Sequence, residues 1–204
     1  FKNKWNYKIL NTITYNYSDQ WKKRLLNAVD LDKTSLDKLD IEYTNLLISL
    51  IKKFILKFRI NKIDAISSHG HTVFHQPSKG VTYQIGNLPE LAISLNLNVV
   101  CDFRVQDVKL GGQGAPLVPI GDKLLFSDYD YCLNLGGFSN VSYKNKDEII
   151  AFDISPVNCV LNHYSNIIGF DYDNHGLIAK SGNIDLKLLD ELNSLEYYNS
   201  TIPK

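Results

Sequence analysis

One segment of this chain fixes its own structure through the spacing of its apolar residues. From Ser35 to Phe58, large apolar side chains recur every three or four positions, which is the period of one face of an α-helix. The pattern predicts an amphipathic helix of about six turns, which must bury its apolar face against another layer of structure. We expect that layer to be a sheet containing a strand over residues 63–67. The apolar face comprises Leu36, Leu39, Tyr43, Leu46, Leu47, Leu50, Ile51, Phe54, Ile55 and Phe58.

Shorter patterns on either side of this helix alternate between strand and helix. Residues 5–17 are rich in β-branched and aromatic side chains and predict one or two strands, after which Ser18 or Asp19 caps a short helix that ends near Asp30. Beyond the long helix, apolar runs predict strands at residues 63–67, 82–85 and 99–103, with a helix over residues 89–95 between the last two. We expect these strands to pair in one mixed sheet.

The alternation restarts after a glycine-rich loop at residues 111–114. Strands are predicted at residues 131–135, 141–143 and 149–154, followed by a helix over residues 156–167 with Pro156 in its first turn and a final amphipathic helix over residues 186–192. The restart predicts two domains, residues 1–128 and 129–204. The fold class is α/β, with mixed sheets flanked by helices.

The composition disfavours several classes of protein. Lys plus Arg and Asp plus Glu both number 22, so the net charge favours neither nucleic acid nor an anionic membrane as a partner. No apolar run approaches the roughly 20 residues that a membrane-spanning helix needs. The cysteines, Cys101, Cys132 and Cys159, are far apart and odd in number, which suits a reducing cytoplasm better than a disulfide framework or a zinc site. The chain opens at Phe1 and has no methionine, which predicts that it is a piece of a longer protein.

Polar, glycine-rich loops concentrate between Ser67 and Asn140, and they predict a binding pocket because each one gives up apolar burial. His69, His71 and His75 follow a predicted strand, at the position where open α/β sheets bind ligands. Their ring nitrogens suit the recognition of sugar hydroxyls. Two other interpretations stay open. The histidines could be structural, or they could bind zinc, which the lack of a nearby carboxylate disfavours.

Two glycine-rich segments would let the backbone approach a ligand closely. Gly111 to Gly114 lacks the lysine and hydroxyl residue of a Walker phosphate loop, and a plain tight loop explains it equally well. The segment from Asn134 to Asn140 reads as a strand, a glycine pair and a second strand, which is a hairpin whose tip amides could meet a phosphate. Hairpin turns also look this way without any ligand.

Asp153 stands at the end of a predicted apolar strand and shortly before a predicted helix. An acid at the point where an apolar strand opens into a cleft is partly desolvated, which makes the carboxylate a usable base. The alternative is that Asp153 caps the helix that follows.

Taken in order, these motifs resemble the anhydro-N-acetylmuramic acid kinase family over about Ile63 to Lys204. The resemblance also includes Gly176 to Gly182 and the closing Pro203-Lys204. It implies an actin-like, ribonuclease H-like ATPase fold of two domains with a cleft between them. The motifs are His69-Gly70-x-Thr72-Val73-Phe74-His75-Gln76-Pro77, Gln84-Ile85-Gly86-Asn87, Asp102-Phe103-Arg104-x-x-Asp107, residues 111–119, Asn134-Leu135-Gly136-Gly137 and Phe152-Asp153.

The resemblance implies a cytoplasmic kinase that uses ATP and Mg²⁺. Such a kinase opens 1,6-anhydro-N-acetylmuramic acid with water and phosphorylates O6, giving N-acetylmuramic acid 6-phosphate in cell-wall recycling. It also implies a homodimer, with no nucleic acid or membrane partner and no protein metal ligands. Asp153 would be the catalytic base. The implied substrate-binding residues are His69, Thr72, Arg104, Asp107 and Gln113, and the implied nucleotide-phosphate-binding residues are Gly136, Gly137 and Asn140.

The chain departs from the family pattern in several places. The amino-terminal Gly-Thr-Ser-x-Asp-Gly phosphate loop and the second half of the carboxyl domain are absent from the sequence. His71 stands where the family has glutamine, Ile154-Ser155 where it has threonine-glycine, and Asn174-His175 where an aspartate or glycine is usual. Two alternative functions therefore stay open, a divergent actin-fold sugar kinase or ATPase with another substrate, and a catalytically silent homologue that binds sugar.

Overall fold

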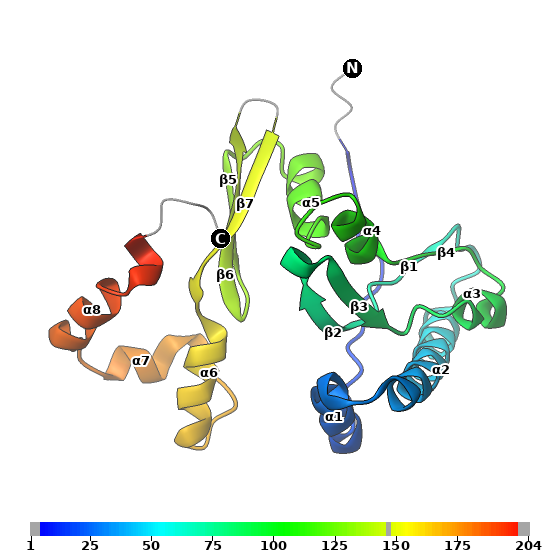
Figure 1. Ribbon diagram of the computed structural model, residues 1–204, viewed down its shortest axis with the longest axis horizontal. Helices are drawn as coiled ribbons and strands as arrows, with labels where there is room; N and C mark the ends of the chain where they lie inside the picture. Colours follow the sequence, from blue (N-terminus) through cyan, green and yellow to red (C-terminus); the bar gives the residue numbers. More distant parts are fainter. Residues whose placement is uncertain (1–4, 146–147, 200–204) are drawn as a thin grey trace. The chain divides into compact units, whose positions relative to one another are not determined.

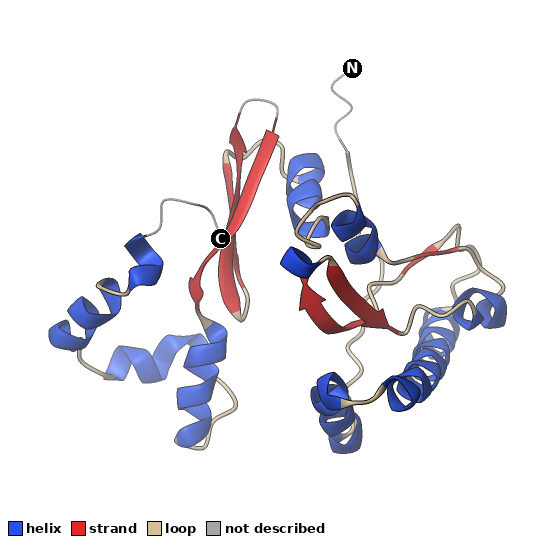
Figure 2. Cartoon of the chain, viewed as in Figure 1, coloured by secondary structure: helices blue, strands red, loops and turns tan. Residues whose placement is uncertain are grey.

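The computed structural model describes residues 5–145 and 148–199, which form a mixed α/β structure of helices and small sheets (Figures 1 and 2). Residues Asn6–Val118 make up one compact unit, the N-terminal unit. Trp5 and the described residues from Pro119 onward make up the other, the C-terminal unit. The closing Pro203-Lys204 motif lies outside the described residues.

The long helix α2 (Lys33–Phe58) is the main support of the N-terminal unit, as its apolar period predicts. Asp32 caps it by accepting a hydrogen bond from the Ser35 amide at 2.9 Å, and the left-handed Arg59 ends it. The shorter helix α1 (Asp19–Leu26) and a 3₁₀ turn (Asn27–Asp30) precede it. Ser18 caps α1, which confirms the predicted start of that helix.

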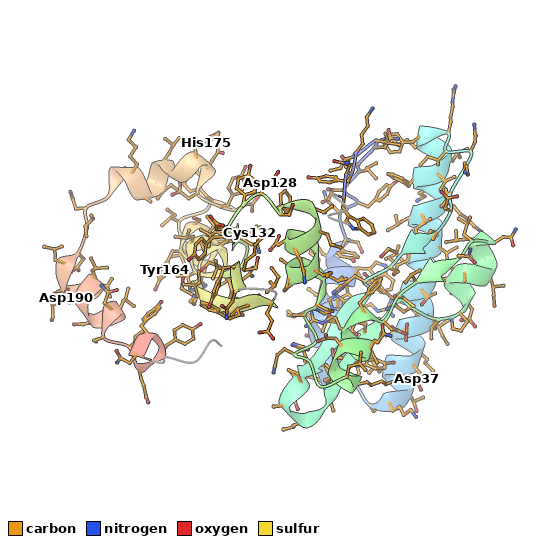
Figure 3. The ribbon with its side chains drawn as sticks, turned by 90° about the horizontal axis from the view of Figure 1, so that it is seen from above. Asp37, Asp128, Cys132, Tyr164, His175 and Asp190 are labelled. Carbon is orange, nitrogen blue, oxygen red and sulfur yellow. The ribbon has the colours of Figure 1, made fainter. Side chains whose placement is uncertain are left out.

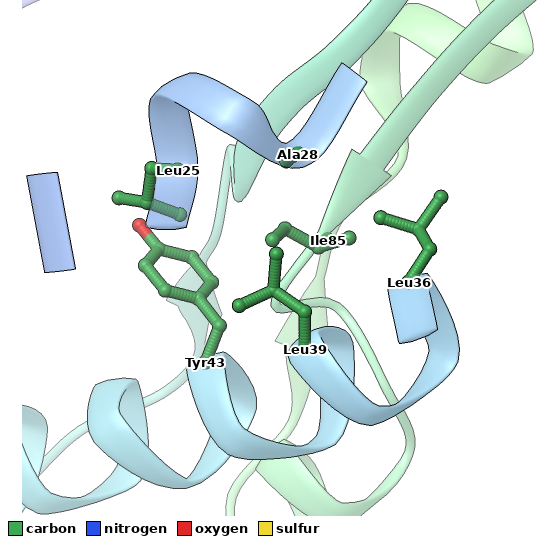
Figure 4. Close-up of a cluster of buried hydrophobic side chains, with 6 residues drawn as sticks. All are labelled: Leu25, Ala28, Leu36, Leu39, Tyr43 and Ile85. Carbon is green, nitrogen blue, oxygen red and sulfur yellow. The ribbon is translucent and has the colours of Figure 1, made fainter. Parts of the chain in front are cut away.

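One face of α2 builds the core of this unit (Figure 4). None of the ten apolar residues of that face is exposed, and those in its first three turns are the most deeply buried. They pack against Ile85 of strand β3 (Val81–Ile85), so α2 lies on the strand after the histidine motif and not on the strand at residues 63–67 that we expected. The buried cluster consists of Leu25, Ala28, Leu36, Leu39, Tyr43 and Ile85.

The strands of the N-terminal unit form two separate pairs, so the prediction of one mixed sheet was wrong. Strands β1 (Ile66–Ser67) and β4 (Val99–Val100) are parallel, and β2 (His71–Gln76) is antiparallel to β3. The predicted strands over residues 5–17 were also wrong, since that segment pairs with no described strand. A strand is stable only when a neighbouring strand forms hydrogen bonds with its backbone groups. A composition rich in β-branched residues does not provide that neighbour.

Helix α3 (Glu90–Leu95) was predicted, whereas α4 (Phe103–Lys109) and α5 (Leu117–Leu125) were not. Strand β4 stops at Val100, and Asp102 adopts a left-handed backbone with φ 60° that turns the chain into α4. The predicted strand over residues 99–103 therefore ends early. Arg104 and Asp107 consequently lie on a helix and not on a loop.

In the C-terminal unit, β5 (Tyr131–Leu135), β6 (Phe138–Asn145) and β7 (Glu148–Pro156) form an antiparallel sheet in that order. These strands were predicted, although β6 and β7 are longer than expected. Helix α5 is tied to the sheet because the Ser142 hydroxyl donates to Asp122 Oδ2 at 2.5 Å.

Three helices follow the sheet, α6 (Asn158–Ile167), α7 (Leu177–Ser181) and α8 (Leu186–Asn193). Pro156 is the last residue of β7, so it does not lie in the first turn of α6 as predicted, and α7 was not predicted at all. Figure 3 labels Tyr164 on α6, His175 just before α7 and Asp190 on α8, and all of these side chains are exposed.

Candidate functional site

Polar side chains gather where the parallel strands β1 and β4 end. Ser68 follows β1, and its hydroxyl donates to Asn87 Oδ1 at 2.9 Å. Asn87 Nδ2 donates in turn to Asp102 Oδ1, which follows β4, at 3.0 Å. The carboxyl end of parallel strands is where open α/β sheets bind their ligands. His69 is exposed beside this series of hydrogen bonds, with its Nδ1 3.1 Å from the Gly70 carbonyl oxygen.

A buried carboxylate holds the turn that carries Asn87. Asp40 of α2 is only 5% exposed, and it accepts a hydrogen bond from the Gly86 amide at 2.7 Å and weaker ones from the Thr44 and Tyr83 hydroxyls. Burial raises the pKa of Asp40, and these hydrogen bonds act in the opposite direction. Asp40 was not predicted as a functional residue, although its position on the apolar face, three residues before Tyr43, was a signal in the sequence.

A polar layer lies on the face of the β2–β3 hairpin that is opposite to Tyr83 and Ile85. Gln84 Nε2 donates to the Thr82 hydroxyl at 2.9 Å and to the Thr72 hydroxyl at 3.4 Å. His75 Nδ1 is 3.3 Å from the same Thr82 oxygen. Burial lowers the pKa of His75, and the charge of Arg104 on α4 lowers it further. This layer therefore includes two of the predicted substrate-binding residues, Thr72 and Arg104.

Asp107 organises the glycine-rich loop after α4. Its Oδ2 accepts a hydrogen bond from the Gly114 amide at 2.7 Å, and its carbonyl oxygen accepts one from the Gly112 amide at 2.8 Å. A Cβ atom on Gly112 would lie 2.2 Å from Asp107 Oδ2, and one on Gly114 would lie 2.9 Å from His75 Cε1. The tight loop thus needs these two glycines for its own packing, and one carboxylate oxygen of Asp107 is already engaged. Gln113 is exposed on the loop.

The structure brings some of the predicted substrate-binding residues together. Thr72 and Arg104 share the polar layer, and Asp107 reaches that layer through the packing of Gly114 on His75. The surface is hollowed at two other places, along the outer face of α2 (about 430 Å³) and between α1 and α2 (about 370 Å³). Neither hollow is lined by the polar groups of these motifs. The candidate site is therefore identified by its polar side chains and not by the shape of the surface.

The half-buried ring of His71 predicts a pH-dependent stability for this unit. Its ring is half-buried against the Tyr43 ring, 6.0 Å between centroids, and burial lowers the pKa of His71 below 6.5. A smaller lowering comes from His69, and the hydrogen bond to the Leu25 backbone opposes both. Between the lowered pKa and 6.5 the unfolded chain binds more protons than the folded one, so the free energy of unfolding falls as the pH drops through that window.

Replacing His71 with glutamine, the residue of the family pattern, is expected to remove this contribution. The stability difference between His71→Gln and the unchanged protein should shift in favour of the variant as the pH falls from about 7.5 to about 5.5. Urea unfolding at both pH values measures it. The exposed His163→Gln variant, on α6 of the C-terminal unit, is the control. An identical change with pH in the unchanged protein and in His71→Gln would refute the assignment.

In the C-terminal unit, Asn134, Asn140 and Asp153 form one row across the sheet. The register pairs Asn134 with Asn140 and Asn140 with Asp153, and directly paired residues of antiparallel strands face the same side. Asp153 is exposed and lies inside β7, three residues before its end. The alternative that Asp153 caps α6 was wrong, because Val157 occupies the cap position and no side chain caps that helix.

The glycine tip between β5 and β6 is joined to the start of α6. The Gly137 carbonyl oxygen accepts hydrogen bonds from the amides of Val157 at 2.8 Å and Cys159 at 3.2 Å, and the Gly136 carbonyl oxygen accepts one from the Asn158 amide at 3.3 Å. The predicted hairpin is confirmed. Its tip carbonyls, and not its amides, make the contacts with the helix.

Asn158 strengthens the same junction through its side chain, whose Nδ2 donates to the carbonyl oxygens of Leu135 at 3.1 Å and Gly136 at 2.8 Å. This residue was not predicted, because its only signal in the sequence was an amide at the start of a predicted helix. A Cβ atom on Gly137 would meet only Cys159 Cβ, at an ordinary 4.0 Å. Packing therefore does not demand glycine at this position, and the bare backbone is open to a ligand.

Ser155 stands where the family pattern has glycine, and it contacts a side chain of the neighbouring strand β6. Its hydroxyl is 3.1 Å from the hydroxyl of the buried Ser139, which also donates to the Ser155 carbonyl oxygen at 3.1 Å.

Across residues 5–145 and 148–199, no three His, Cys, Asp or Glu side chains gather in a way that could hold a metal ion. No helix in this part of the chain is both long and apolar enough to cross a membrane.

Comparison with known proteins places these motifs in one family. The family model for anhydro-N-acetylmuramic acid kinase matches residues 3–204. The chain is 38% identical to the anhydro-N-acetylmuramic acid kinase of Zymomonas mobilis, over 77% of this chain and 45% of that protein. It is 42% identical to that of Pseudomonas syringae over 70% and 41%, and 35% identical to that of Haemophilus influenzae over 90% and 51%. The chain thus spans about half the length of the curated relatives it matches. It belongs to the anhydro-N-acetylmuramic acid kinase family.

Proposed function

We propose that the complete protein is an ATP-dependent kinase that opens 1,6-anhydro-N-acetylmuramic acid with water and phosphorylates O6. The product is N-acetylmuramic acid 6-phosphate, an intermediate of peptidoglycan recycling and amino sugar catabolism. The observation that carries this proposal is the family match over residues 3–204. The same match disfavours a kinase for an unrelated sugar and a silent sugar-binding homologue.

Asp153 is the proposed base. The oxygen of water attacks the anomeric carbon, the bond from that carbon to O6 breaks, and Asp153 takes the proton of the attacking water. O6 then receives the γ-phosphoryl group of ATP, and ADP leaves. The exposed carboxylate of Asp153 lies on one face of the edge strand β7, which its pairing with β6 holds in place, and this suits a group that must meet a water molecule and a sugar.

Substrate recognition is assigned to the polar side chains of the N-terminal unit. Arg104 and Thr72 supply donors from the polar layer, and Asp107 has one carboxylate oxygen left over from its hydrogen bond to the loop. His69 and Gln113 are exposed on flanking loops and complete the proposed set. Hydroxyl-rich ligands are bound by such mixtures of donors and acceptors.

The glycine tip and Asn140 are assigned to the nucleotide phosphates, because Gly137 leaves the backbone open and Asn140 lies beside Asp153. The described residues offer no metal cage, so we propose that Mg²⁺ arrives with ATP, where it neutralises phosphate charge.

We further propose an actin-like fold with domains at residues 1–128 and 129–204 around a cleft, in a cytoplasmic homodimer.

A phosphotransfer assay on the complete protein tests this function. We expect ATP consumption and a sugar 6-phosphate, identified by ³¹P NMR, with 1,6-anhydro-N-acetylmuramic acid. We expect neither with the open-ring sugar, which lacks the bond that the reaction breaks. Phosphorylation of the open-ring sugar, or ATP hydrolysis with no sugar phosphate formed, would overturn the proposal.

A further inference from the structure

Two buried polar atoms of the polar layer have no hydrogen-bond partner. They are Gln84 Oε1, an acceptor, and Arg104 Nε, a donor, and no other buried side-chain nitrogen or oxygen among the described residues is left unpaired. A buried polar group without a partner is costly, so each such atom in a folded protein needs an explanation. Their opposite hydrogen-bonding characters suggest one explanation for both.

The two atoms belong to neighbouring elements. Gln84 lies on β3, which packs against α4, the helix of Arg104. Gln84 is only 6% exposed, and its Nε2 is held by the hydroxyls of Thr82 and Thr72. His75 contacts the same Thr82 hydroxyl, and the positive charge of Arg104 acts on the His75 ring. The unpaired acceptor and the unpaired donor therefore lie in one polar layer.

The two threonines give Gln84 a fixed orientation. Because both hydroxyls hold its Nε2 end, its Oε1 end has one direction left for an incoming donor. The guanidinium of Arg104 is planar, so a hydrogen bond at Nε fixes the direction of its two terminal nitrogens. A hydrogen bond from Nε to Oε1 would satisfy both atoms and aim the charged end of Arg104.

We infer that Gln84 is a positioning residue for Arg104. When the sugar binds, Arg104 Nε–H donates to Gln84 Oε1, and the terminal nitrogens of Arg104 are held toward the sugar. This inference rests on the proposed function, in which Arg104 contacts the substrate. The inference adds Gln84, which has no role in the proposed function, to the residues that recognise the sugar. It also explains why the Gln84-Ile85-Gly86 motif begins with a buried amide.

The test uses the complete protein and measures KM, kcat and thermal stability for Gln84→Met, which keeps the length of the side chain and removes the acceptor. We expect KM for the anhydro sugar to rise between about 10-fold and about 100-fold, as for the loss of a hydrogen bond to a charged group, with kcat and KM for ATP changed less than about threefold. Gln106→Leu, an exposed glutamine on the same helix as Arg104, is the control and should match the unchanged protein.

A double-mutant cycle with Arg104→Lys, which lacks the Nε donor, shows whether Gln84 acts through Arg104. The Gln84→Met change should add little to KM once Arg104 is lysine. Fully additive effects, or an unchanged KM in Gln84→Met, would overturn the inference. If Gln84→Met does not fold, Gln84→Glu decides, since it keeps an acceptor and should hold KM within about threefold. A larger rise would overturn the inference. An inactive unchanged protein would instead defeat the proposed function.

Discussion

Replacing Asp153 with asparagine in the complete protein is expected to lower turnover by ~10² to 10⁴ while the sugar still binds. Asparagine keeps the shape and the hydrogen-bonding reach of the side chain, but it cannot take the proton of the attacking water. Calorimetric binding of the anhydro sugar and the rate of sugar phosphate formation separate the two effects. Near-normal turnover in a folded Asp153→Asn protein would defeat the catalytic assignment.

The same substitution should leave the fold intact. Asp153 is exposed and does not cap α6, so we expect the free energy of unfolding to change by less than about 0.5 kcal/mol. Glu148→Gln is the matched control, since it removes a carboxylate from the first residue of the same strand. That control should keep its turnover, which would show that the loss in Asp153→Asn comes from position and not from charge alone.

Replacing Gly70 with alanine is expected to be far more damaging than replacing Gly80. Both glycines have φ +69°, so both substitutions cost the strain of a left-handed backbone, about 1 to 2 kcal/mol. A Cβ atom on Gly80 would meet nothing within 4 Å, whereas one on Gly70 would lie 2.5 Å from the Ile85 carbonyl oxygen and 3.0 Å from Asn87 Nδ2. The contact with backbone cannot be relieved by rotating a side chain.

We therefore expect Gly80→Ala to cost about 1 to 2 kcal/mol and Gly70→Ala to cost a further 1 to 3 kcal/mol from overpacking. Urea unfolding with an unchanged slope measures both values. The extra cost in Gly70→Ala should be accompanied by weaker sugar binding, because Asn87 anchors the chain of hydrogen bonds beside His69. Equal costs for the two variants would contradict the close approach of Gly70 to Ile85.

The elements that sequence predicted well are those whose signals are local. Helix α2 carries its period over many turns, and the hairpin from β5 to β6 carries its turn residues between its own strands. The segment at residues 5–17 has the composition of a strand but no partner, and pairing is a non-local property. Helix α4 was missed because its start depends on the left-handed backbone of Asp102, which no periodicity announces.

The candidate site divides in the same way. Its motifs were recognisable as a family pattern, and the structure shows how Asp107 and the glycines of its loop fit one another. Asp40, Gln84 and Asn158 were assigned no role, because each acts through a contact with a segment distant in sequence or through a buried layer. Periodicity assigns a residue to a face of its own element, and it does not reveal the groups that face it.

The junction between the glycine tip and α6 has a consequence for motion. The first backbone amides of this ten-residue helix end on the carbonyl oxygens of Gly136 and Gly137, and the Asn158 side chain adds two further hydrogen bonds. A tilt of the tip that keeps these hydrogen bonds must turn the helix with it. A ligand that displaced the tip by a small angle would swing the far end of α6, at Ile167, through a larger distance, and would thereby transmit its presence to the chain beyond.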